Sequence, residues 1–139
     1  MSIRLTNAAA SAGANSTGIS GYAGSSPKIA FHEGAVNANA ELAPAGDLLA
    51  TLTIASFGAA SEGTIASAGG SAAAGASGTP ACFVLYKNDG TTKVLDGSVG
   101  EKDGENPSGE DIDFEDGDIT WVAGGTVSLS SFSLTLPPH

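Results

Sequence analysis

The chain has few of the residues on which most enzymatic chemistry depends. Its 139 residues include one cysteine, two histidines, one tryptophan, two tyrosines and five basic side chains. Cys82 has no second cysteine with which to form a disulfide within the chain, and its apolar neighbours predict a buried thiol. Leu, Ile, Val and Phe total 28 residues, which predicts a small core in a chain of one domain's length.

Targeting segments are lacking as well. The longest run of large apolar residues is far shorter than the roughly 20 residues of a membrane-spanning helix. Residues 1–21 contain one arginine and no apolar segment of the kind that a secretory signal requires. We therefore expect a cytoplasmic product with no membrane partner. The glycosylation acceptor sequence Asn15-Ser16-Thr17 is then a coincidence.

Positive charge is scarce. Fifteen acidic residues outnumber five basic ones, which gives a formal net charge of −10. The basic residues are scattered along the chain: Arg4, Lys28, Lys87, Lys93 and Lys102. Direct binding to nucleic acid is not expected, because phosphate backbones are held by clustered lysine and arginine. A strongly acidic exterior instead suits a positively charged protein partner.

Small residues are abundant, with 24 alanines, 20 glycines and 17 serines. Residues 1–26 are rich in them, and we interpret this segment as a poorly structured N-terminal arm, with a short helix possible over 3–14, that docks on a partner or a sister subunit. Residues 58–79 are also rich in small residues and lack the lysine of a phosphate-binding loop. We expect a flexible or partner-ordered loop there, with at most one short strand at 63–67.

Residues 27–139 have the alternation typical of a β-domain. Strands are predicted at 28–32, 48–54, 82–86, 93–99, 111–114, 119–122 and 126–136. In the second of these, Leu48 shares a face with Leu52, and Leu49 lies on the other face. The Asp89-Gly90 pair predicts a hairpin between the third and fourth segments, because both positions tolerate positive φ.

The last predicted strand changes phase. Val127 and Leu129 share one face, whereas Phe132 and Leu134 share the other. A bulge or a switch between two sheets is therefore expected near residues 130–131. Seven or eight short strands with glycine-rich turns and no convincing long helix predict an all-β fold, an antiparallel β-sandwich or jelly roll.

No arrangement of side chains typical of an enzyme is evident. His32 and Glu33 are adjacent, but neighbours on a strand point to opposite faces and would not act as a pair. His139 is the last residue of the sequence, and there is no G-x-S-x-G nucleophile motif. We expect no enzyme, no catalytic residue and no cofactor.

An acidic stretch offers one alternative site. Residues 100–118 hold nine of the fifteen acidic residues, and calcium prefers hard oxygen ligands in a flexible loop. The candidate ligands are Asp111, Asp113, Glu115, Asp116 and Asp118. Their spacing does not match an EF-hand loop, so we favour an acidic rim that is solvated or faces a partner, and we assign no metal site.

Several segments together resemble a known group of proteins. They are 26–34 (SPKIAFHEG), 45–53 (AGDLLATLT), 83–91 (FVLYKNDGT), 95–100 (LDGSVG), 127–129 (VSL) and 132–137 (FSLTLP). In this order they resemble short virion structural proteins of tailed bacteriophages, most of all the jelly-roll cement, or decoration, proteins on the outside of the head shell. The resemblance spans about residues 26–138.

This resemblance implies a protein without catalytic residues that stabilises contacts between subunits of the major capsid protein. It would reside on the capsid surface of the virion, and in the host cytoplasm during assembly. A homo-oligomer, either dimer or trimer, would match the local symmetry axes of such a shell. Residues 1–26 and 58–79 are the expected contacts with the shell, because neither segment is expected to fold on its own contacts.

Two other classes remain open on the sequence alone. The first is another virion part, namely a tail, neck or fibre-base module. The second is a small β-module that binds calcium or carbohydrate. The scarcity of aromatic side chains argues against the stacking on which carbohydrate binding depends.

Overall fold

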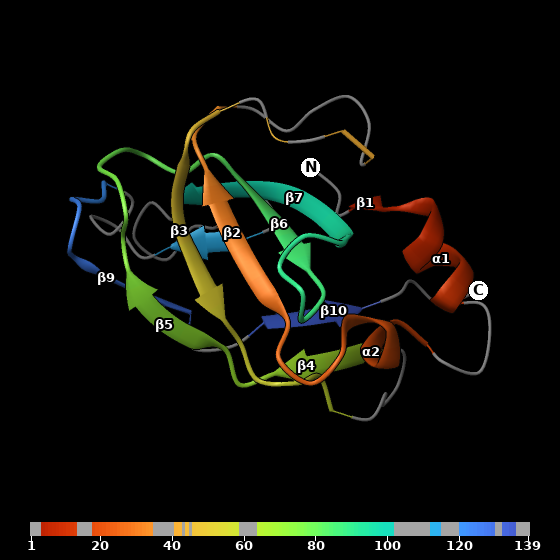
Figure 1. Cartoon of the computed structure of the whole chain (residues 1–139). Helices are drawn as coiled ribbons and strands as arrows, with labels where there is room; N and C mark the ends of the chain where they lie inside the picture. The colour runs from red at the N-terminus through yellow and green to blue at the C-terminus, as the bar shows by residue number, and fades with distance from the viewer. Residues whose placement is uncertain are drawn as a thin grey trace.

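The computed structural model describes residues 4–13, 18–34, 41–42, 44, 46–58, 64–101, 112–114, 120–129 and 132–135. They form the all-β antiparallel sandwich that the alternating segments predict, with two short helices beside it (Figure 1). The elements are β1 (Arg4–Leu5), α1 (Asn7–Gly13), α2 (Gly18–Ala23), β2 (Lys28–His32), β3 (Leu48–Thr53), β4 (Thr64–Ser67), β5 (Gly70–Ala73), β6 (Cys82–Tyr86), β7 (Lys93–Glu101), β8 (Ile112–Phe114), β9 (Thr126–Leu129) and β10 (Phe132–Thr135).

The main sheet has the strand order β1-β7-β6-β2-β3, and all of its neighbours are antiparallel. Strand β6 lies at its centre with four of its five residues buried, which confirms the strand predicted at 82–86. The predicted hairpin between β6 and β7 is also confirmed, and Gly90 has a φ of 71° in its turn. Strand β8 joins the far end of β7 in parallel, where Val99 lies opposite Ile112.

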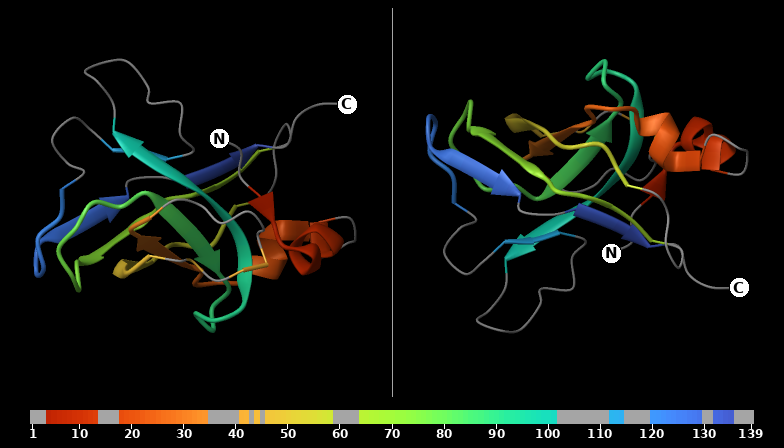
Figure 2. Two further views of the ribbon diagram at one scale, coloured as in Figure 1. Left: turned by 90° about the horizontal axis from the view of Figure 1, so that it is seen from above. Right: turned by 90° about the horizontal axis from the view of Figure 1, so that it is seen from below.

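The second layer consists of two short ladders, β4 with β10 and β5 with β9 (Figure 2). One ladder ends with Ser67 opposite Phe132, and the next begins with Gly70 opposite Leu129. Two residues therefore separate the ladders on each strand, and the register does not slip between them. The predicted bulge or switch at 130–131 falls outside the described residues, and β9 and β10 on either side of it both pair within the second layer.

The segment 58–79 differs from the expected loop. Its described residues, 64–79, contain two strands, β4 and β5, where at most one was predicted. Alanine, serine and glycine have weak strand propensity, but pairing with β9 and β10 supplies the backbone hydrogen bonds that local sequence does not. Tertiary pairing overrides propensity in β5, so two short strands of this segment, β4 and β5, are part of the sandwich.

Strand β3 corrects the predicted facing of two leucines. Leu48 is 50% exposed, whereas Leu49 is buried. The register with β2 explains this, because Phe31 lies opposite Ala50 and His32 lies opposite Leu48, which leaves Leu49 as an extra residue in a bulge. A bulge reverses the alternation that precedes it, and the sequence contains no sign of it.

The predicted strand at 119–122 is not found in its described residues. Trp121 makes an isolated bridge to Gly78, and the Trp121 amide donates to the Gly78 carbonyl at 2.8 Å. Val122 is 67% exposed and leads into a turn at Ala123-Gly124, where Gly124 has a φ of 87°.

Aromatic side chains fill the space between the two layers. Phe31 and Phe83 lie opposite each other on β2 and β6. The Phe31 ring packs edge-on against Trp121, with ring centroids 5.3 Å apart, and the Phe83 ring packs against Phe132 at 5.8 Å. Phe57 joins the second group, 5.8 Å from Phe132. The small core is therefore held by rings that bridge the layers.

Candidate interaction surfaces

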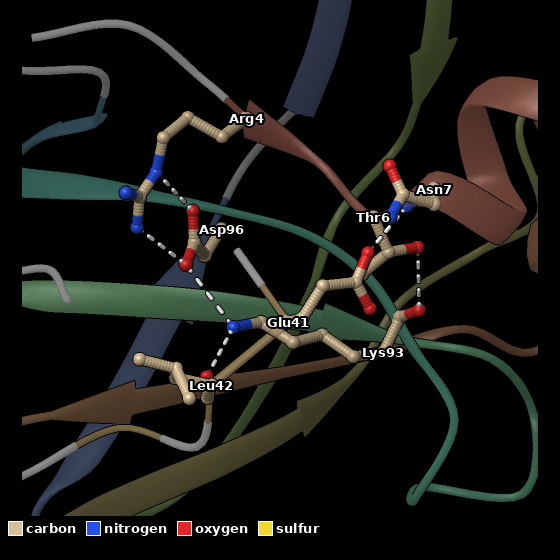
Figure 3. A network of polar contacts seen from close by, with 7 residues as sticks. All are labelled: Arg4, Thr6, Asn7, Glu41, Leu42, Lys93 and Asp96. Atoms are coloured by element: carbon tan, nitrogen blue, oxygen red, sulfur yellow. Dashed lines mark hydrogen bonds and ion pairs between the residues drawn. The ribbon is translucent and has the colours of Figure 1, made fainter. Parts of the chain in front are cut away.

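The N-terminal segment is fastened to the main sheet by one buried carboxylate (Figure 3). Arg4 donates from Nε and Nη2 to the two carboxylate oxygens of Asp96, at 2.9 and 2.8 Å. Lys93 donates to the same Asp96 at 3.1 Å and to the carbonyl of Leu42 at 2.7 Å. This network joins β1 and residues 41–42 to β7, and its role in the described structure is to hold the fold together.

Helix α1 begins at a side-chain cap. The Thr6 hydroxyl accepts a hydrogen bond from the Ala9 amide at 3.2 Å, in the manner of an N-cap residue, and the Thr6 amide donates to the carbonyl of Val94 at 2.9 Å. Ala9 of α1 and Ala23 of α2 are fully buried. The described part of the expected arm, residues 4–13 and 18–26, therefore lies on the domain.

A second set of contacts joins α2 to the β6–β7 turn. The Lys87 ammonium lies 4.5 Å from the ring centre of Tyr22, a cation–π contact. The Ser26 amide donates to the side-chain carbonyl of Asn88 at 2.8 Å. In the same turn, hydrogen bonds from the side chain and backbone of Thr92 and from the amide of Thr91 lower the pKa of Asp89 below its ordinary value of 3.8.

The two adjacent candidates for acid–base chemistry have different neighbours. The Nδ1 atom of His32 lies 3.2 Å from the carbonyl oxygen of Gly46. The carboxylate of Glu33 lies against Gly78, so closely that a Cβ there would overlap it. Neither contact brings His32 and Glu33 together as a pair.

Cys82 is the first residue of the central strand β6, and its thiol is buried, as its apolar neighbours predict. It is 3% exposed, and burial raises its pKa above the ordinary value of 9.0, with Asp96 adding to the effect and Lys93 opposing it. A protonated and covered thiol is a poor nucleophile, so this side chain acts as a core residue.

The calcium hypothesis falls mostly outside the described residues. Asp111, Glu115, Asp116 and Asp118 are not among them, and for Asp113 only the backbone is described. Within the described ranges there is no group of three or more His, Cys, Asp or Glu side chains that could hold a metal ion. Lys102 and residues 15–17 also lie outside those ranges.

The described surface has one recess that the sequence did not predict. It measures about 550 Å³ and lies between the end of β8 and strand β9. Its lining residues are Phe114, Thr120, Trp121, Val122, Gly125, Thr126, Val127 and Ser128. The sequence feature that could have indicated the recess is the apolar pair Trp121-Val122, which comes shortly before Gly124-Gly125. We interpreted this pair as part of a strand at 119–122.

Comparison of the chain with protein-family models, with curated proteins and with solved structures gave no match. In the part of the chain that the structure describes, no helix has the length and apolar character needed to cross a membrane.

Proposed function

We propose that this chain is a decoration protein of a tailed-bacteriophage head, which binds the outer surface of the shell and stabilises contacts between major capsid protein subunits. The observation that carries the proposal is where the resembling segments lie in the fold. They fall on β2, β3, β6, β7, β9 and β10, so the likeness follows the framework strands in chain order.

The physical properties of the chain suit such a role. A shell presents the same binding position many times. A binding free energy of only a few kcal/mol at each position is therefore enough to keep many copies bound to one particle. Segments of small residues allow one backbone to lie close to another, as contact with a shell subunit requires. Strand β5 shows such an approach within the chain, because Gly70 lies against the carbonyl of Thr53. A net charge of −10 keeps free copies apart before they dock.

Copy number in purified particles tests the proposal. Quantitative mass spectrometry should count this chain against the most abundant shell protein in particles of the virus that encodes it. A ratio of one, or a simple fraction of one, is expected for a protein that tiles the head. A handful of copies per particle would replace the proposal with a tail, neck or fibre-base role, and complete absence would reject a virion role.

A further inference from the structure

The recess follows the backbone of a strand edge. Strand β9 pairs on one side with β5, and the described residues supply no strand to its other side. Thr126, Val127 and Ser128 all line the recess, although consecutive residues of a strand point to opposite faces. A hollow lined by three consecutive residues therefore runs along the strand's edge, where backbone groups are presented.

The floor of the recess is aromatic. Phe114 and Trp121 lie there with ring centroids 5.4 Å apart, and both are more than nine-tenths buried. Val122, which is 67% exposed, also lines the recess. An extended peptide on such an edge gains main-chain hydrogen bonds from the strand, while its alternate side chains find pockets such as this one.

The distribution of charge selects the occupant. Strand β7 begins at Lys93 and ends at Glu101, about 26 Å away at the rise of an extended strand, and Glu101 lies opposite Phe114 of the recess. Within the described ranges no charged residue of either sign lines the recess, so a basic occupant meets no like charge there. Glu101 beside Phe114 and the net charge of −10 of the whole chain favour a positively charged partner.

We infer that the recess beside β9 binds an extended, basic segment of a partner protein, which adds to β9 as a further strand and places an apolar side chain over Phe114 and Trp121. The inference deepens the shell-binding role and rests on that proposal for the partner's identity, which would then be a segment of the shell protein. The strand pairing itself is testable without the particle.

The first experiment uses the full-length, ¹⁵N-labelled chain and a synthetic peptide of alternating lysine and valine. We expect the peptide to shift the amide resonances of residues 126–128 and to slow their hydrogen exchange. Two control peptides separate the contributions: one is N-methylated at alternate residues and cannot pair as a strand, and one has glutamate in place of lysine. Each should bind at least about tenfold more weakly.

A matched pair of variants locates the site. Ser128→Arg places a positive charge on an exposed position of the recess, and Thr51→Arg places the same charge on an exposed position of β3 outside it. We expect Ser128→Arg to weaken peptide binding about tenfold and Thr51→Arg to change it less than about twofold, with unchanged melting temperatures. Equal effects of the two variants would overturn the inference, as would binding that N-methylation does not weaken.

The two proposals fail in different ways. If the chain tiles the head but the peptide leaves residues 126–128 unperturbed, the β9 site is rejected and the decoration role stands. If the peptide binds at β9 but the chain is missing from particles, the strand-pairing site stands and the shell protein is rejected as its partner.

Discussion

Asp96 holds Arg4 through two parallel hydrogen bonds, at 2.9 and 2.8 Å, although 92 residues separate them in the chain. The Asp96 side chain is 5% exposed and also binds Lys93, whose side chain is 12% exposed. Arg4 is more accessible, at 29%. The Asp96 carboxylate is therefore the shared centre of the network. Of its two cationic partners, Lys93 is the more buried and Arg4 the more exposed.

Removing this carboxylate should cost more stability than removing one cation. Asp96→Ala leaves two partly buried cations without their partner, and we expect a loss of about 3 kcal/mol in the free energy of unfolding. Arg4→Ala leaves Asp96 paired with Lys93, and we expect about 1 kcal/mol. Denaturant unfolding measures both losses. Equal losses would show that Lys93 does not stabilise the Asp96 carboxylate once Arg4 has been removed.

Gly70 should tolerate no side chain. A Cβ there would lie 2.2 Å from the carbonyl oxygen of Thr53, and neither backbone can move without breaking a ladder. We expect Gly70→Ala to lower the free energy of unfolding by about 2 kcal/mol. Gly75→Ala is the matched control, because its Cβ would meet nothing closer than 3.8 Å. The steric argument fails if the two variants unfold at the same denaturant concentration.

The ring of Phe132 should contribute strongly to the contact between layers. It touches Phe57 and Phe83 and is 5% exposed, so Phe132→Ala removes a bridge and leaves a cavity. We expect a loss of about 4 kcal/mol. Val122→Ala, at a position 67% exposed, should change stability by less than about 0.5 kcal/mol. Thermal unfolding of both variants provides the measurement.

The Cys82 thiol should make the protein less stable in alkali. In the unfolded chain it ionises near its ordinary pKa of 9.0, and burial raises the pKa in the folded state. Its contribution is thus fully present below pH 9.0 and declines as the pH rises above that value, because the unfolded chain loses its proton first. Between about pH 8 and about pH 10.5, Cys82→Ala should lose less stability than the native chain. The prediction is wrong if plots of the free energy of unfolding against pH run parallel for the native chain and Cys82→Ala.

The carboxyl group of Asp89 should titrate at unusually low pH. Its pKa is lowered from 3.8, first by the Thr92 hydroxyl and then by the amides of Thr92 and Thr91. The stability that it contributes is present above pH 3.8 and declines as the pH falls further, because the unfolded chain takes up its proton first. NMR titration should find the Asp89 midpoint well below 3.8, and Thr92→Val should move it upward. A Thr92→Val midpoint unchanged from that of the native chain would remove the hydroxyl as the cause.

The sequence predicted the elements whose pattern is local. Alternating residues identified β2, and the Asp89-Gly90 pair correctly indicated the β6–β7 hairpin, although the tight turn has Asn88 and Asp89 at its centre and Gly90 as its last residue. The phase change between Val127 and Phe132 marks the break between β9 and β10, two short strands that both pair in the second layer. These features need only a short window of sequence.

The features that were missed depend on distant partners. Strand β4 coincides with the one short strand allowed at 63–67, whereas β5 was not predicted, because its glycine, serine and alanine residues form a strand only by pairing with β9, far away in the chain. The bulge at Leu49 arises from the register with β2, and no local residue announces it. The recess beside β9 was missed for a different reason: its lining residues all lie within 114–128, but the sequence predicted a strand at 119–122 where the structure has a single bridge and a turn.

The pairing of β4 with β10 also governs when the domain can form during synthesis. Thr64–Ser67 leave the ribosome long before Phe132–Thr135, so the first half of the second layer must wait for its partner. Until then, Phe57 and Phe83 lack the ring that covers them, and shortened products keep an apolar surface open to chaperones and proteases. Completion of the sandwich therefore requires translation to continue through β10, whose ring at Phe132 closes the contact with Phe57 and Phe83.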